Sequence, residues 1–468
     1  MRIFNTYSRE TEEIKAINPP TVTVYTCGPT VYDFAHVGHW FNYVRMDMLI
    51  RGLISSGLRP KWVMNITDVG HLTSDQDEGQ DKLQEGADRE GKSAWEIAEF
   101  YTKDFLEGMK LLNILDPDYI VKATDHIKDQ IELIKKLEEK GFTYEISDGI
   151  YYDTSKFPKY AEFARLDLDE QQAGVRVEVN PEKKQPTDFA LWKFSPIESH
   201  RDMEWDSPWG KGFPGWHIEC SAMSMKYLGD TLDIHTGGID HIPIHHTNEI
   251  AQSEAVTGKP LANYWMHSNH VLIDNQKISK SLGNGIKLTD VIEKGYSPEV
   301  LRLHILESNY KSHSKFSWDS LEAAKNRLNN LKSMAALKYQ TKEAIYDGPT
   351  FSLEDVPTEI ANLLQDDLNT PAILAFLSDV TTQLLSTHLQ NNMLDHFEIM
   401  INGIDNLLGL KLNEIKDISN EQKHLLKERE EARKNNEWDK SDNIRLELEN
   451  QNIGLNDTKY GPIWYPIN

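Results

Sequence analysis

The chain has 468 residues and a formal net charge of −24, with 39% hydrophobic and 26% charged residues. This length exceeds one ordinary core, so we expect about two to four globular domains. The acidity argues against a general nucleic-acid coat or a DNA partner, because phosphate contacts need lysine and arginine, although a specific RNA partner stays open. No apolar run approaches the roughly 20 residues that span a bilayer, and the N-terminus lacks an apolar signal segment. We therefore expect a cytoplasmic protein with no membrane partner.

The first ordered unit follows the pattern strand, turn, helix, strand. Residues 22–26 alternate as in a strand, 41–53 form an apolar and aromatic run typical of a helix, and 61–67 predict a second strand. This is a βαβ unit, so we expect a Rossmann-type α/β domain with a parallel sheet. We assign residues 1–115 and 216–300 to it.

The segment between these two halves differs in character. Residues 74–92 are acidic and contain glycine, which predicts a mobile loop, and helices are expected at 93–112 and 125–140. Residues 116–215 mix short strands, turns and charged loops. We interpret them as an inserted connective domain.

The C-terminal third is predicted to be helical. Residues 301–410 repeat apolar positions at helical spacing, and Thr370-Pro371 suits a helix start, so we expect a helical bundle. Residues 411–468 form a further small domain in this interpretation. It holds one charged helix at 421–449 and then a short strand-like tail.

Two histidines, His36 and His39, follow the first strand and a Gly-Pro turn in the order His-Val-Gly-His. The N-terminus of a helix attracts anions through its free N–H groups and its dipole. Gly38 lets a nucleotide approach the backbone. The pattern predicts a phosphate site; the alternative is a pair of histidines that merely cap a helix.

Two lysines, Lys277 and Lys280, occur in Lys-Ile-Ser-Lys-Ser, just before a Gly-Asn-Gly stretch. Lysines on a flexible loop can close over a triphosphate and neutralise the charge on departing pyrophosphate. By itself the motif is also compatible with an ordinary surface loop.

The two cysteines, Cys27 and Cys220, fit a reducing compartment and can form one disulfide or meet at a metal. His245 and Glu249 lie four residues apart, hence on one face of a helix. All four residue types are zinc ligands. Nothing in the spacing brings them together, so buried thiols and a surface helix remain the alternative.

Two glycines and a carboxylate follow in Thr-Gly-Gly-Ile-Asp, residues 236–240. Gly238 allows close approach of the backbone, and Asp240 can accept hydrogen bonds from ribose hydroxyls. A turn capped by the aspartate is the equal alternative.

Together these motifs resemble the HIGH and KMSKS signatures of the class I aminoacyl-tRNA synthetases. Within that class the chain is similar to the cysteinyl-tRNA synthetase family. The family-like segments run almost from end to end and comprise residues 27–33, 65–68, 215–223, 263–267, 432–438 and 457–464.

The resemblance implies that one zinc ion is held by Cys27, Cys220, His245 and Glu249 and selects the cysteine thiol over the serine hydroxyl. It implies ATP-dependent activation of L-cysteine to cysteinyl-adenylate, with Mg²⁺ accompanying ATP, and transfer to the 3′ end of tRNA(Cys). The helical bundle and the C-terminal domain are implied to hold the tRNA stem and anticodon.

The same resemblance assigns the substrate-binding residues: Thr67 and Trp216 to cysteine, His36, His39 and Lys280 (assisted by Lys277) to ATP, and Gly238 and Asp240 to its ribose.

The sequence departs from the usual family form at three places. Trp40 follows the HIGH-like motif where a small residue is usual, residues 68–71 replace a more acidic run, and His241 is an addition. These departures leave open whether His71 or His241 contacts the substrate.

Three rival functions are weighed against this one. A cysteine ligase that uses the same adenylation core on a small amine would lack the C-terminal tail. A nucleotidyltransferase with an HxGH motif would lack the zinc set. A non-catalytic zinc-dependent RNA-binding protein would not need the lysines and histidines, all of which are present.

Overall fold

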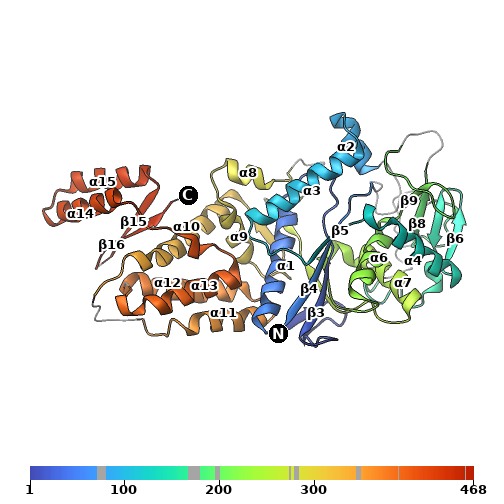
Figure 1. The fold of residues 1–468 in the computed structure, drawn as a ribbon, viewed down its shortest axis with the longest axis horizontal. Coiled ribbons are helices and arrows are strands. Elements are labelled where there is room, and N and C mark those ends of the chain that lie inside the picture. The colour runs from blue at the N-terminus through green and yellow to red at the C-terminus, as the bar shows by residue number, and fades with distance from the viewer. Residues whose placement is uncertain are drawn as a thin grey trace.

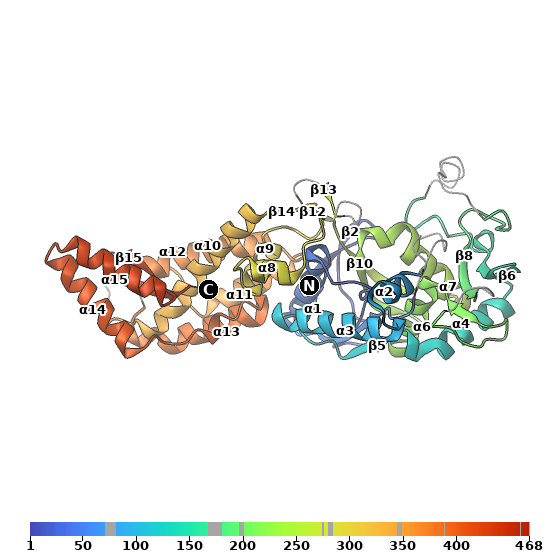
Figure 2. The ribbon, with the colours of Figure 1, turned by 90° about the horizontal axis from the view of Figure 1, so that it is seen from above.

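The structure is a computed structural model that describes residues 1–70, 81–166, 180–195, 201–273, 276–278, 284–343, 349–387, 389–458 and 460–467; of Lys82 and Lys277 it describes only the backbone. The molecule is elongated, with the parallel sheet and an inserted sheet toward one end and the helical bundle and C-terminal domain toward the other (Figures 1 and 2). None of its described helices has the length and apolar character needed to cross a membrane.

A five-stranded parallel sheet forms the centre of the α/β domain, which confirms the Rossmann-type prediction. Its strand order is β11 (Ala262–Ser268), β10 (Leu232–Gly238), β3 (Thr21–Thr26), β4 (Arg59–Ile66) and β5 (Tyr119–Lys122). The chain runs outward from β3 to β4 and β5, and from β10 to β11 on the other side. The strand order therefore reverses between β3 and β10, where ligands bind in open α/β sheets.

The helices of this domain are α1 (Val37–Ser55), α2 (Lys82–Glu90), α3 (Ala94–Leu111), α4 (Ile127–Glu139), α6 (Trp216–Leu228) and α7 (Thr247–Thr257). Helix α1 is buried along most of its length. Its Trp40 stacks on Phe105 of α3 with ring centroids 5.4 Å apart. Gly108, one turn further along α3, makes room for the indole, because a β-carbon there would lie 2.5 Å from Trp40 Cη2.

The structure differs from the predictions for this region in one helix and one domain boundary. The predicted loop at 74–92 contains helix α2, which Asp81 caps by accepting hydrogen bonds from the N–H groups of Leu83 and Gln84. The predicted inserted domain begins too early at 116, because β5 pairs with β4 in the main sheet. Four residues of strand are too short to show an alternating pattern.

The inserted region forms an antiparallel sheet of β6 (Thr143–Ile146), β7 (Gly149–Tyr152), β8 (Phe189–Phe194) and β9 (Gly212–Pro214). Two smaller sheets lie elsewhere: β1 (Arg2–Asn5) with β2 (Glu10–Glu13), and β12 (Val271–Ile273) with β13 (Gln276–Lys277) and β14 (Ser314–Phe316).

The helical bundle comprises α8 (Leu288–Glu293), α9 (Pro298–Leu306), α10 (Trp318–Ala335), α11 (Asp355–Gln365), α12 (Thr370–Thr387) and α13 (Leu394–Leu408). A buried ion pair joins it to the α/β domain: Arg302 of α9 contacts Asp47 of α1, and both side chains are fully buried. Arg302 also donates to the carbonyl oxygens of Leu112 and Leu408 at 2.8 and 2.6 Å. The two parts therefore share one core.

The C-terminal domain holds α14 (Asn420–Lys434), α15 (Trp438–Asn450) and the hairpin of β15 (Ile453–Thr458) with β16 (Gly461–Pro466). The prediction of a single helix at 421–449 is wrong. The helical conformation is interrupted at Asn435–Glu437, where Asn436 has a φ of 60°. Asparagine tolerates this left-handed conformation, which ends a helix.

Candidate functional site

A cavity of about 730 Å³ opens at the carboxyl ends of β3, β4 and β10, where the strand order reverses. Ten of the predicted site residues line it or provide its wall. Its lining includes Cys27, His36, His39, Thr67, Trp216, Cys220, Gly238, Asp240 and His245. Glu249 lies directly behind it, bonded to His245. Residues far apart in the sequence thus meet at one place.

His36 is the N-cap of α1, and its ring stacks on that of His39 with centroids 3.8 Å apart. The His36 backbone N–H donates to His39 Nδ1 at 3.1 Å. Desolvation within the cavity and the adjacent His36 lower the pKa of His39 to about 3. The ring is therefore neutral at pH 7 with its proton on Nε2, and it can donate a hydrogen bond to a phosphate oxygen.

The lysine loop is described only in part. Lys280 lies outside the described residues, as does His71, and for Lys277 only the backbone in β13 is described. The neighbouring Ile278 lines the cavity, as does Gly285 beyond the residues that are not described. A further cation, Lys287, also lines the cavity and lies over the Phe34 ring at 4.2 Å. Sequence reasoning missed Lys287, since no motif marks it.

Gly238 ends β10, and Asp240 follows in a short 3₁₀ turn at Ile239–His241. A β-carbon at Gly238 would collide with the Asp240 carboxylate. Glycine is thus required for the carboxylate to take its position beside the cavity, where it is exposed.

Thr67 follows β4 and is buried. Its hydroxyl accepts a hydrogen bond from Asn65 Nδ2 at 3.0 Å, and Asn65 Oδ1 accepts one from the Gly28 N–H at 2.8 Å. Trp216 begins α6, and its ring lies 4.3 Å from that of His245. Thr67 and Trp216 therefore share the cavity with Cys27, which directly follows β3.

The four predicted metal ligands come together in the structure. Ligand atoms of Cys27, Cys220, His245 and Glu249 all lie within 4.8 Å of one another, and all four residues are buried. His245 Nε2 is 2.7 Å from Glu249 Oε1, although His245 belongs to a π-turn, Ile242–His246, that precedes α7. Both cysteines are free thiols, so the structure contains no disulfide between them.

The charges around this cluster favour a cation. Burial opposes charging of His245, but Glu249 and Cys220 outweigh burial and raise its pKa to about 10. Burial likewise raises the pKa of the Cys220 thiol, yet Cys27 and His245 bring it down to about 7. A buried carboxylate and an acidic thiol thus hold a proton on His245 that a metal ion can replace.

A second layer of histidines surrounds the cluster, and sequence reasoning missed it. His217 Nδ1 lies 3.0 Å from His245 Nδ1, and His235 Nε2 lies 2.7 Å from Glu249 Oε2. His246 Nε2 lies 3.4 Å from Cys27 Sγ, and His246 in turn contacts His267 at 2.7 Å.

These contacts also give a second possible ligand set, Cys27, His235, His246 and Glu249. It shares Cys27 and Glu249 with the first set. Three residues of the first set line the cavity, Cys27, Cys220 and His245, whereas Cys27 alone does so in the second set. A metal ion held by the first set would therefore be the one exposed to the cavity.

His241 also lines the cavity. Its ring lies 5.1 Å from that of His245 and 5.9 Å from that of Trp216. Burial lowers the pKa of His241 to about 4.

Comparison with known proteins assigns this fold and site to a class. A family model described as the tRNA synthetases class I (C) catalytic domain matches residues 13–326. The structure also resembles that of Mycobacterium tuberculosis methionyl-tRNA synthetase in complex with methionyl-adenylate, with a TM-score of 0.61 and 13% identity over 84% of this chain and 92% of the other. The fold is that of a class I tRNA synthetase.

Curated relatives narrow the assignment. A cysteine–tRNA ligase of Treponema denticola is 42% identical and covers 99% of both chains. Cysteine–tRNA ligase 1 of Burkholderia lata is 43% identical over 98% of this chain and 96% of its own. The chain therefore belongs to the cysteine–tRNA ligase family of class I tRNA synthetases.

Proposed function

We propose that this chain activates L-cysteine with ATP and transfers it to the 3′ end of tRNA(Cys). One observation carries the proposal: a single cavity brings the His36–His39 pair together with a buried pair of thiols, a histidine and a glutamate. A phosphate-binding helix start beside a thiol-rich cation site fits a substrate that has both a triphosphate and a thiol.

Zinc fits the donor set, and Cys27, Cys220, His245 and Glu249 would hold it. Two thiolates, one imidazole and one carboxylate are all zinc ligands, and the Glu249 carboxylate 2.7 Å from His245 supports a cation at this place. Bound zinc prefers a thiolate sulfur to a hydroxyl oxygen, which supplies discrimination between cysteine and serine. The second-layer contacts of His217 and His235 fix the orientation of His245 and Glu249.

The residues of the cavity divide the work of activation. Thr67 and Trp216 enclose the amino acid, and Gly238 and Asp240 hold the ribose. His36 and His39 donate hydrogen bonds to the phosphates, while Lys280, assisted by Lys277, neutralises the departing pyrophosphate, and Mg²⁺ accompanies ATP. The step needs positioning and charge stabilisation rather than proton transfer, so neutral imidazoles and lysines suffice.

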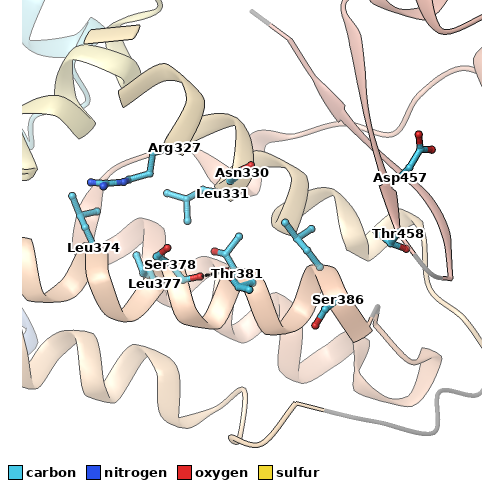
Figure 3. A pocket seen from close by; sticks show the side chains of 12 residues that line it. Arg327, Asn330, Leu331, Leu374, Leu377, Ser378, Thr381, Ser386, Asp457 and Thr458 are labelled. Atoms are coloured by element: carbon cyan, nitrogen blue, oxygen red, sulfur yellow. Dashed lines mark hydrogen bonds between the residues drawn. The ribbon is translucent and has the colours of Figure 1, made fainter. Parts of the chain in front are cut away.

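The helical bundle (α8 to α13) and the C-terminal domain (411–468) hold the tRNA in this proposal. A cavity of about 420 Å³ lies where they meet (Figure 3). Side chains of α10 and α12, including Leu331 and Thr381, face each other across it, with Asp457 and Thr458 of β15 at its edge. Apolar walls with polar edges suit an unstacked base. We place the protein in the cytoplasm, because its proposed substrates are tRNA and ATP.

Charging of total tRNA with radiolabelled cysteine tests the proposal, with serine in parallel. Acid-precipitable cysteine without serine is the expected result, together with about one zinc per chain in the same sample. Cysteine-dependent pyrophosphate exchange without tRNA charging would point instead to a cysteine ligase acting on a small amine. Absence of both reactions in folded, zinc-loaded protein would refute the catalytic function.

A further inference from the structure

We propose that His241 contacts the substrate during activation and donates a hydrogen bond, through Nε2, to an anionic oxygen where the amino-acid carboxylate meets the α-phosphate. The inference rests on the proposed function and adds a positioning residue to it.

His241 lies between the two halves of the cavity. On one side are Trp216 and His245, whose rings are 5.9 and 5.1 Å away and which belong to the amino-acid end. On the other side are Asp240, its neighbour in the chain, and His39, which is close enough for His241 to influence its pKa. A substrate that spans from the thiol site to the ribose site must pass His241 at the junction of its two parts.

The packing of the ring leaves one nitrogen for this contact. His241 Nδ1 is buried without a hydrogen-bond partner in the described part of the chain. It faces Gly237, where a β-carbon would lie 2.7 Å from it. A buried N–H without an acceptor is less tolerable than an unfilled lone pair, so the neutral ring carries its proton on Nε2. The charged ring carries one there too, so Nε2 donates in either state.

The folding of the chain does not account for this histidine. Buried polar groups normally have hydrogen-bond partners within the protein or in ordered water. His241 directly follows Asp240, at a position where its Nδ1 has no hydrogen-bond partner in the described chain. A substrate oxygen gives the Nε2 proton an acceptor, while the Nδ1 lone pair stays against Gly237.

The proposed contact changes no bond itself. During activation a carboxylate oxygen forms a bond to the α-phosphorus, and the bond between that phosphorus and the β-phosphate oxygen breaks, with pyrophosphate leaving with the electron pair. Negative charge stays on the α-phosphate oxygens throughout. A donor aimed at the junction aligns the carboxylate for attack, so its loss lowers kcat more than it raises KM.

The test compares three variants by cysteine-dependent ATP–pyrophosphate exchange, with zinc content and thermal unfolding measured on each. His241→Leu removes both nitrogens, and His241→Gln retains an N–H donor near the position of Nε2. His396→Leu, a change at an exposed histidine of α13 outside the cavity, is the control.

We expect His241→Leu to lower kcat/KM about 10- to 100-fold, mainly in kcat, with zinc content and melting temperature close to those of the wild type. His241→Gln should recover most of the loss, and His396→Leu should equal the wild type.

Exchange by His241→Leu within threefold of the wild type would overturn the inference. So would a loss that is accompanied by loss of zinc and not restored by glutamine, since that pattern shows a purely structural role. If the wild-type protein shows no cysteine-dependent exchange, the proposed function itself fails, and the two failures are thereby distinguished.

Discussion

The Glu249 carboxylate connects the two layers of the thiol cluster. One oxygen contacts His245 and the other His235, each at 2.7 Å, and Cys27 Sγ lies 3.9 Å away. Burial alone would raise the pKa of this carboxyl, but His235 and His245 hold it far below its usual value. The side chain is therefore ionised and supplies the negative charge of the site.

Replacing this charge tests the metal site at the scale of a single residue. Glu249→Gln keeps the shape and removes the charge, so we expect zinc affinity to fall by more than about 100-fold, beyond the effect of losing an outer contact. Zinc content after dialysis against buffered free zinc measures the change. Glu254→Gln on the same helix is the control, and equal zinc retention by both variants would contradict the assignment.

The neutral histidines of the site predict a loss of stability in acid. His246 and His267 are buried with pKa values well below 6.5, and that of His241 is about 4, in each case chiefly through burial. Below pH 6.5 these histidines bind protons in the unfolded chain but stay neutral in the folded chain. The free energy of unfolding therefore decreases as the pH drops from about 6.5 to 4.

Thermal unfolding between pH 7.5 and 4.5 measures this slope. Each such histidine contributes up to about 1.4 kcal/mol per pH unit. At pH 5–6, His241→Leu should reduce the pH dependence of the free energy of unfolding by roughly the contribution of one histidine. Any release of metal affects the wild type and the variant alike. An unchanged slope would show that His241 is protonated in the folded state.

At the scale of elements, the contact between α1 and α3 explains an unusual residue. Trp40 is a large residue in a helix-packing interface, and Gly108 of α3 makes room for it. The two residues are 68 positions apart in the sequence. Neither residue alone predicts the other, because the helix packing that joins them is visible only in the structure.

We expect Gly108→Ala to destabilise the protein by about 1–3 kcal/mol, despite the higher helix propensity of alanine, because the new methyl group strikes a buried indole. Trp40→Phe removes the atoms that it would strike. In a double-mutant cycle monitored by denaturant unfolding, the double variant should lose less free energy of unfolding than the two single variants lose in sum. Additive costs would show that the ring and the glycine do not interact.

Sequence patterns missed other elements for the same reason, because these elements depend on contacts or single residues that leave no pattern. The βαβ unit was predictable because strands alternate, and the four residues proposed as metal ligands do lie together in the structure. Helix α2, strand β5 and the break between α14 and α15 were not, because each depends on a cap, a four-residue pairing or one left-handed asparagine. The second-layer histidines carry no spacing signal, since they come from four separate segments of the chain.

At the scale of the whole molecule, the C-terminal domain presents an aromatic residue to solvent. Trp438 is 54% exposed, and the Arg433 guanidinium lies 5.9 Å from its ring. An exposed indole beside a cation suits stacking of an unpaired base, at about 1–3 kcal/mol per base.

Trp438→Ala should therefore raise the KM for tRNA about 10- to 100-fold and leave ATP–pyrophosphate exchange unchanged, because exchange needs no tRNA. Steady-state charging over a range of tRNA concentrations gives the comparison. Leu446→Ala removes another exposed apolar side chain from α15 and serves as the control. A loss of exchange in Trp438→Ala would mean that the change disturbs the fold rather than tRNA binding.

Helix α1 begins at the cavity with His36 and ends against α11 and α13 of the bundle. Its 19 residues span about 28 Å at 1.5 Å per residue. Near its far end Arg51 donates to the carbonyl oxygen of Asn406 at 2.8 Å, and Asp47 receives Arg302 from the bundle. Because one continuous helix joins the bundle to the cavity wall, a tilt of the bundle against the sheet would also move His36 and His39.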